Sequence, residues 1–320
     1  MNNKHKIIAV EEHFMHPSLS NHLGHAAQQP DQIKKRLFDF SDIRIREMDS
    51  AGIDVQILSH QSPGSQRLKN EVAIDACKDV NNALAQVISN HSDRFLGFAM
   101  LPTNLPIDAA SELRRSVEEL GFKGAMIHGL IGDQRLFPDN EMFWPIFARA
   151  QELGVPIYLH PANIHPAVAK AYLNDYASEY PGLMNAGWGF TMETATIGIR
   201  MVLSRVFERY PDLQIVLGHL GETLPFLMWR IDLALNRPGN DGVAFRDVFT
   251  SNFHITTSGF FSDPAMLCCI QEMGADRILF AIDYPFVPNE PGPMWMERLM
   301  LNAADKDKIL HGNAEKLLGI

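Results

Sequence analysis

Several side chains that can bind a metal ion or transfer a proton lie where short apolar runs of the sequence end. The run IIAV is followed by Glu11, Glu12 and His13, the run IYL by His160, and the run LFAI by Asp283. An ionised carboxylate that is buried without a partner is costly. These side chains therefore either reach solvent or converge on a positive charge.

Glu11 and His13 are two residues apart, and side chains along a strand alternate between its two faces. The two therefore point the same way, whereas Glu12 points the opposite way. With His160 and Asp283 they form a mixed nitrogen and oxygen set that suits Zn²⁺ or Mn²⁺ and leaves room for water or substrate. We predict one divalent metal ion held by these four residues. The alternative is a set of separate hydrogen bonds at strand ends, without a metal.

A further candidate lies in the segment GHLGE at residues 218–222. His219 follows the apolar run IVL, and Glu222 comes three residues later, at the start of the next predicted helix. A carboxylate there can orient the imidazole through its far nitrogen, as in a base held by a third group. It can equally be a favourable acid at a helix N-terminus. We predict a catalytic role for His219 and leave both interpretations of Glu222 open.

Eight short apolar runs, each followed by a helical pattern, position these residues. They cover residues 6–12, 55–60, 95–101, 124–129, 156–161, 214–219, 254–259 and 277–283. Several are almost entirely apolar, which is typical of parallel strands buried on both faces. No glycine-rich phosphate-binding motif follows the first run, which argues against a Rossmann fold. Eight strand–helix alternations favour an α/β fold, a (β/α)8 TIM barrel, as a single domain over residues 1–320.

The strands of such a barrel deliver their C-terminal ends to one face, where the chemistry of this fold takes place. Ser258 and five of the thirteen histidines lie at predicted strand ends, the histidines being His13, His60, His128, His160 and His219. One such histidine alone is more often structural, but the whole set indicates a site. The long connections at residues 15–40 and 161–188 would lie on the same face and could form a lid or subunit contacts.

Composition excludes several classes of protein. The formal charge of −10 and the lack of a basic tract argue against nucleic-acid binding. The three cysteines, Cys77, Cys268 and Cys269, suggest neither a disulfide framework nor a CxxC metal site. No apolar run is long enough for a membrane span, and the N-terminal apolar run is too short for a signal peptide. We therefore expect a cytoplasmic protein that has no membrane partner.

Five motifs in order carry a resemblance that covers nearly the whole chain: AVEEHF, LSHQSPG, FWPIFARAQELGVPIYLHP, VLGHLGETLPFLMWRID and FAIDYPF. They resemble the amidohydrolase superfamily and, within it, the branch of metal-dependent non-oxidative decarboxylases. The resemblance implies the same four metal ligands, an acid/base histidine at His219 and a homodimer or homotetramer. The E-x-H of Glu11 and His13 is similar to the phenolic-acid decarboxylases, whereas hydrolases of the superfamily usually have H-x-H.

Substrate contacts are predicted less directly. In the MWRID motif, Arg230 is a candidate for binding the substrate carboxylate, the alternative being a surface salt bridge. Phe286 and Trp229 could pack on an aromatic ring or belong to the core. In related decarboxylases the strand that ends at His128 tends to end with asparagine, and His60 stands where a small or hydrophobic residue is common. Both histidines could therefore line the substrate pocket or be structural.

The resemblance predicts loss of CO2 from a hydroxylated aromatic carboxylic acid, either γ-resorcylate or a related ortho-hydroxybenzoate. Protonating the ring carbon first avoids an unfavourable aryl carbanion, and a divalent ion bound to the carboxylate and the ortho hydroxyl would stabilise the charge. By analogy with the family, Asp283 donates that proton, while His219 handles the phenolic proton or orients the substrate. The alternatives are a metal-dependent hydrolase of a lactone or amide and an inactive metal-binding protein.

Overall fold

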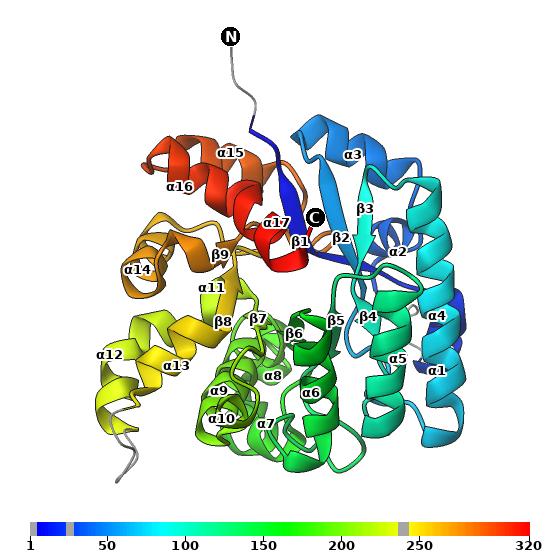
Figure 1. The fold of residues 1–320 in the computed structure, drawn as a ribbon, viewed down its shortest axis with the longest axis horizontal. Helices are drawn as coiled ribbons and strands as arrows, with labels where there is room; N and C mark the ends of the chain where they lie inside the picture. Colours follow the sequence, from blue (N-terminus) through cyan, green and yellow to red (C-terminus); the bar gives the residue numbers. More distant parts are fainter. Residues whose placement is uncertain (1–4, 24–28, 236–242) are drawn as a thin grey trace.

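Short parallel strands occupy the centre of the molecule and helices surround them (Figure 1). The computed structural model describes residues 5–23, 29–235 and 243–320. One sheet has the order β1-β2-β3, and the other runs from β4 to β9 in sequence order. The strands are β1 (Ile8–Phe14), β2 (Val55–His60), β3 (Phe95–Gly97), β4 (Ala99–Met100), β5 (Ala125–His128), β6 (Ile157–His160), β7 (Ile215–Leu217), β8 (Phe253–Thr256) and β9 (Ile278–Leu279).

Backbone hydrogen bonds join the two sheets at both edges. β3 and β4 are separated only by Phe98, whose amide donates to the carbonyl of Leu58. At the other edge, the amide of Val10 donates to the carbonyl of Phe280, and the amide of Asp283 donates to that of Glu11. The chain is therefore a (β/α)8 barrel, as predicted, in which β3 and β4 correspond to the single strand expected at residues 95–101.

Helices and helical turns follow the strands around the outside. The α-helices are α1 (Pro17–Leu23), α2 (Asp31–Leu37), α3 (Ile43–Ala51), α4 (Asn70–Asn90), α5 (Pro106–Glu118), α6 (Trp144–Leu153), α7 (Pro166–Tyr172), α8 (Asn174–Ala177), α9 (Gly189–Leu203), α10 (Val206–Arg209), α11 (His219–Glu222), α12 (Leu224–Ala234), α13 (Phe245–Asn252), α14 (Asp263–Met273), α15 (Pro291–Arg298), α16 (Ala303–Asp307) and α17 (Asn313–Leu318). Shorter turns are η2 (Glu141–Phe143), η3 (Pro181–Met184), η4 (Ala275–Arg277) and η5 (Lys308–Gly312).

Apolar residues divide into an inner and an outer layer. The inner layer fills the barrel and includes Val10, Ile57, Met126, Tyr158 and Val216. The larger outer layer lies between strands and helices, where α4, for example, buries residues at helical spacing. Ala314 and Leu318 of α17 belong to the inner layer, so the C-terminal helix packs against the barrel interior. The strands are therefore packed on both faces, inside the barrel and against the helices.

A register shift in β1 sets the direction of two candidate ligands. The shift lies between Ala9 and Glu12. Val10 packs in the inner layer, and the next residue, Glu11, also points into the barrel. An extra residue at a bulge allows two consecutive side chains to take the same side of a strand. The strand therefore packs against the core at its start and still presents Glu11 and His13 inwards at its end.

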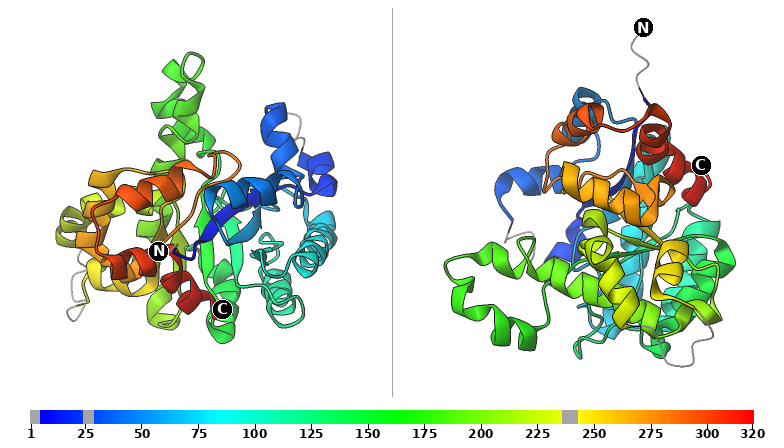
Figure 2. Two further views of the ribbon diagram at one scale, coloured as in Figure 1. Left: turned by 90° about the horizontal axis from the view of Figure 1, so that it is seen from above. Right: turned by 90° about the vertical axis from the view of Figure 1, so that its left-hand side faces the viewer.

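The two long connections both contain helices. Residues 161–188 carry α7, α8 and η3, which project from the barrel as one arm (Figure 2). The connection at residues 15–40 carries α1 and α2, and its residues 24–28 lie outside the described part. Across the described residues, the helices are too short or too polar to cross a membrane.

Candidate metal centre and active site

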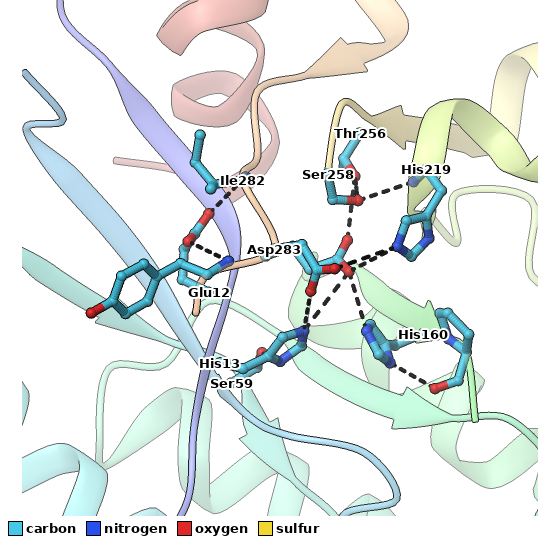
Figure 3. Close-up of polar contacts among 12 residues, drawn as sticks. Glu12, His13, Ser59, His160, His219, Thr256, Ser258, Ile282 and Asp283 are labelled. Atoms are coloured by element: carbon cyan, nitrogen blue, oxygen red, sulfur yellow. Dashed lines mark hydrogen bonds and ion pairs between the residues drawn. The ribbon is translucent and has the colours of Figure 1, made fainter. Parts of the chain in front are cut away.

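Four side chains from three separate regions of the chain converge at one end of the barrel. Glu11 and His13 come from β1, His160 from the end of β6 and Asp283 from the segment after β9, and each offers a ligand atom within 4.8 Å of the others. Figure 3 shows His13, His160 and Asp283 turned toward one another. The structure therefore brings together the four residues that the sequence predicts as metal ligands.

The donor atoms are spaced as ligands of one ion would be. Nε2 of His160 lies 3.2 Å from Oε1 of Glu11, and Nε2 of His13 lies 3.3 Å from Oδ1 of Asp283. Two atoms that are each bound about 2.1 Å from a tetrahedral or octahedral ion lie about 3.0–3.4 Å apart. Among the described residues, Oε1 of Glu11 and Nε2 of His13 are buried without a hydrogen-bond partner. The four residues thus fit a divalent cation.

Charge also favours a cation here. Burial by itself opposes ionisation of Glu11, but the nearby imidazoles of His219, His13 and His160 outweigh it and hold the pKa of Glu11 well below its usual range. Burial alone would lower the pKa of His13, but the nearby carboxylates of Asp283 and Glu11 raise it to about 9. The carboxylates therefore remain ionised and draw positive charge to this point, as a metal site requires.

Each ligand from a strand is held from behind by a neighbouring residue. The hydroxyl of Tyr158 donates to Oε2 of Glu11, which leaves Oε1 facing the other ligands. Oγ of Ser59 lies 3.2 Å from Nδ1 of His13. Nδ1 of His160 lies 2.7 Å from the carbonyl oxygen of Pro161, and because that oxygen can only accept, Nδ1 carries the proton and Nε2 is free to bind a metal.

Tyr158 and Ser59 were not among the predicted residues, although the two-residue period of a strand points to Tyr158. Tyr158 lies two residues before His160 on β6, so both side chains point into the barrel. Thr256 stands in the same relation to Ser258 and lies 2.9 Å from the Tyr158 hydroxyl. A polar residue two positions before a polar strand end is therefore the sequence signal that identifies such supporting residues.

His219 and Glu222 form a pair beside the metal ligands. Nε2 of His219 lies 3.8 Å from Oε1 of Glu11 and 3.9 Å from Oδ2 of Asp283. Its Nδ1 lies 2.7 Å from Oε1 of Glu222, whose other oxygen accepts from the hydroxyl of Thr191. Burial opposes protonation of His219, but the negative charges of Glu222 and Glu11 raise its pKa well above the usual value. The imidazole is therefore held between Glu222 and the two metal-binding carboxylates.

The backbone around this pair is unusual. All five residues from 219 to 223 have positive φ values, between 51° and 74°. Only Gly221 adopts this region without strain, and left-handed conformations cost roughly 1–2 kcal/mol for each other residue. The predicted helix therefore begins at Leu224 rather than at Glu222. Backbone strain of this kind is typical of functional sites, where the surrounding structure enforces it.

A cavity of about 700 Å³ opens beside Asp283 and His219. Its walls are mostly apolar and include Phe190, Pro225, Phe226, Phe260, Phe286 and Val287. The Asp283 side chain is 18% exposed, whereas Glu11 and His13 are fully buried. Asp283 is therefore the most exposed of these metal-binding groups and borders the cavity, and Phe286 lines the same cavity.

Of the two roles left open for His60 and His128, their contacts favour the structural one. His128 is 2% exposed, with Nε2 2.9 Å from the carbonyl oxygen of His60 and Nδ1 2.9 Å from Nδ1 of His160. His60 is 5% exposed, with Nδ1 3.0 Å from the Gln61 carbonyl oxygen and Nε2 accepting from the amide of His16. Protein groups therefore engage both nitrogens of each ring, and substrate contact by His60 and His128 stays a prediction.

Two other predicted residues, Arg230 and Trp229, do not line the cavity. Arg230 is exposed on α12, and Trp229 beside it is 69% exposed. Neither is among the residues that line the cavity, although Phe226 of the same helix is. The structure therefore does not bring Arg230 or Trp229 together with the metal ligands.

Known proteins are similar to this one over nearly the full chain. A family model described as an amidohydrolase matches residues 11–320. The gamma-resorcylate decarboxylase of Polaromonas sp. is 38% identical over 324 residues, which cover 97% of each protein. A crystal structure of a dihydroxybenzoic acid decarboxylase from Polaromonas sp., with bound manganese and the inhibitor 2-nitroresorcinol, matches at a TM-score of 0.90 and 38% identity, covering 98% of this chain and 97% of that one.

A second crystal structure widens the comparison. The 5-carboxyvanillate decarboxylase of Novosphingobium aromaticivorans, in complex with manganese and 4-hydroxy-3-methoxy-5-nitrobenzoic acid, matches at a TM-score of 0.90 and 31% identity. The match covers all of this chain and 97% of that one. Both crystallised relatives thus hold manganese together with a nitro-substituted aromatic ligand.

Proposed function

The chain belongs to the amidohydrolase family, and from this we propose that it is a metal-dependent carboxy-lyase that removes CO2 from a hydroxylated aromatic carboxylic acid. The expected substrates are γ-resorcylate (2,6-dihydroxybenzoate) or a related ortho-hydroxybenzoate. Mn²⁺ is the ion that we expect, because two crystallised relatives hold it. Zn²⁺ is the alternative that the same donor set suits.

The proposal is carried by Asp283, which belongs both to the metal cluster and to the wall of the cavity. It also lies 3.9 Å from Nε2 of His219. A substrate that reaches the metal therefore meets a carboxyl group and an imidazole at the same point. This arrangement supplies proton transfer at the reacting carbon, which decarboxylation of an aromatic acid needs.

The chain's own residues account for the proton movements. Asp283 takes a proton from His219, whose Nε2 lies 3.9 Å from Oδ2 of Asp283, and delivers it to the ring carbon that bears the carboxylate, while the ring supplies the electron pair for the new C–H bond. The C–C bond to the carboxylate then breaks, CO2 leaves, and the electron pair of that bond restores the aromatic ring. His219, held by Glu222, exchanges the phenolic proton of the substrate. A bound divalent ion supplies Lewis-acid stabilisation of the carboxylate and the adjacent phenolic oxygen.

The test compares substrates with and without an ortho hydroxyl. Protein loaded with Mn²⁺ is incubated with γ-resorcylate, salicylate and 4-hydroxybenzoate, and CO2 release is measured. We expect release from at least one of the ortho-hydroxylated acids and none from 4-hydroxybenzoate, which cannot chelate an ion through neighbouring groups. If no ortho-hydroxybenzoate releases CO2 and a lactone or amide is hydrolysed instead, the protein is a hydrolase of the same family.

We further propose that the enzyme is one barrel domain and acts in the cytoplasm as a homodimer or homotetramer. The support for assembly is exposed apolar surface: Phe226, Trp229 and Leu233 of α12 are 78%, 69% and 66% exposed. Tyr172 and Tyr176 of the projecting arm are 71% and 62% exposed. Large exposed apolar side chains that gather on neighbouring elements commonly mark subunit interfaces. Light scattering of the purified protein tests this assembly.

A further inference from the structure

Glu12 is adjacent to a metal ligand on each side, yet its carboxylate points away from the metal cluster. The residue is fully buried, and Figure 3 shows its side chain reaching the segment that carries Asp283. Because of the alternation along β1, Glu11 and His13 point into the barrel while Glu12 faces the neighbouring segment. Its role is therefore different from that of a ligand.

The carboxylate of Glu12 binds the backbone on both sides of Asp283. Its Oε1 accepts from the amide of Ile282 at 3.0 Å, and its Oε2 accepts from the amide of Tyr284 at 3.3 Å. Asp283 itself has a φ of 74°, in the left-handed region that non-glycine residues seldom adopt. The two amides that flank an unfavourable conformation are thus fixed by one side chain.

A buried network holds Glu12 in turn. Nε2 of Gln56 donates to Oε2 of Glu12 at 3.3 Å, and Nη1 of Arg44 donates to Oε1 of Gln56 at 3.2 Å. Arg44 is fully buried, and its Nη2 donates to the carbonyl of His13 at 2.6 Å. Its guanidinium also lies 4.6 Å from the ring centre of Tyr284. The network therefore contacts the backbone of two metal-binding segments from the side opposite the metal.

We propose that Glu12 is a positioning residue, which fixes Asp283 at the metal by binding the amides of Ile282 and Tyr284. The inference rests on the proposed metal-dependent function and extends it to a residue that contacts neither the metal nor the substrate. Groups that orient metal ligands typically change metal affinity 10- to 100-fold when they are removed. The alternative is that Glu12 stabilises the barrel generally and has no particular connection with Asp283.

The variant Glu12→Gln separates these alternatives. Glutamine keeps the size of the side chain, but only one of its two ends can accept, so its amide group opposes a backbone N–H donor. We expect Mn²⁺ affinity, read from free Mn²⁺ by electron paramagnetic resonance, to fall 10- to 100-fold. The matched control is Glu112→Gln, because Glu112 is 4% exposed and hydrogen-bonded to Asn81 on the outer helices. The control should change the affinity less than twofold.

A double-mutant cycle then tests the connection with Asp283. In an Asp283→Asn background, Glu12→Gln should weaken Mn²⁺ binding by no more than a further twofold, because the ligand that it positions is already altered. In a His160→Asn background, it should still weaken binding about tenfold. Equal losses in the two backgrounds, or unchanged affinity in the single variant, would overturn the proposal.

A milder variant covers the case in which Glu12→Gln does not fold. Gln56→Met removes the third donor to Glu12 and leaves both backbone amides bound, so Mn²⁺ affinity should fall two- to fivefold. Unchanged affinity in this variant counts against the network. Because the readout is metal binding, failure of wild-type protein to release CO2 contradicts the proposed function and leaves this result interpretable.

Discussion

Glu11 and Glu12 are neighbours on one strand and are equally buried, yet they differ in what surrounds their oxygens. Oε1 of Glu11 has no hydrogen-bond partner among the described residues and lies 3.2 Å from an imidazole nitrogen of His160. Glu12 has hydrogen-bond donors on both oxygens, two of them backbone amides. One carboxylate is left with unused binding capacity, and the other has none.

The pKa values follow the same division. The imidazoles that surround Glu11 outweigh its burial and hold its pKa well below the usual range. Burial raises the pKa of Glu12, whereas the amide of Ile282 and the charge of Arg44 act in the opposite direction and favour the carboxylate form that accepts from both amides. Residue type and burial therefore do not distinguish a ligand from a supporting residue. A ligand is distinguished from a supporting residue by unused hydrogen-bonding capacity together with opposite charge nearby.

Replacing Glu11 should have the largest effect. Glu11→Gln removes the negative charge at the metal and leaves an amide facing the imidazoles of His13 and His160. We expect CO2 release at saturating Mn²⁺ to fall about 10³-fold or more, beyond the roughly 10- to 100-fold typical of residues that only support a ligand. Turnover and metal content are measured beside Glu12→Gln. A smaller loss for Glu11→Gln than for Glu12→Gln would reverse the comparison.

His219 and Glu222 differ in the same way as Glu11 and Glu12. His219 faces the metal ligands, and Glu222 holds His219. We expect His219→Asn to lower kcat about 10²-fold or more, since it removes a proton-transfer group. Glu222→Gln should lower kcat only about tenfold, because it weakens one charge-assisted hydrogen bond. Steady-state kinetics on a substrate that releases CO2 measures both. Equal losses would mean that Glu222 acts on the substrate directly.

The ligands could be predicted from the sequence because a simple geometric rule places them. Residues at the ends of parallel strands meet on one face of a barrel, so Glu11, His160 and Asp283 converge although the sequence separates them widely. The E-x-H spacing then assigned Glu11 and His13 to the same side. That assignment used only residues 11–13, so the register shift between Ala9 and Glu12 did not upset it.

The remaining features depend on contacts that no local pattern encodes. The ring of His128 lies against the His60 carbonyl oxygen and His160, contacts that its position at a strand end does not reveal. The left-handed backbone at residues 219–223 has only Gly221 as a sequence signal. The two residues whose backbone amides bind Glu12, Ile282 and Tyr284, lie 270 and 272 residues away in the sequence. Every residue except proline has such an amide, so no sequence pattern marks these two.

His254 shows that unused hydrogen-bonding capacity alone does not make a metal site. Replacing it should have the smallest effect of these variants, confined to the pH dependence of stability. Its Nδ1 is buried without a partner among the described residues, as Nε2 of His13 is. Burial, assisted by the positive charges of Arg277 and Lys316, lowers the pKa of His254 to about 3, whereas carboxylates raise that of His13 to about 9. Below pH 6.5 the unfolded chain protonates this histidine and the folded chain does not, so the free energy of unfolding decreases as the pH falls toward 3. Between pH 7 and pH 5 the loss is about 2 kcal/mol.

His254→Gln should remove that part of the pH dependence and leave CO2 release unchanged. The variant of an exposed histidine, His22→Gln, should show the same pH dependence of unfolding as wild type. Denaturant unfolding at both pH values measures the difference, and parallel pH profiles for His254→Gln and wild type would show that His254 is accessible to protons in the folded protein.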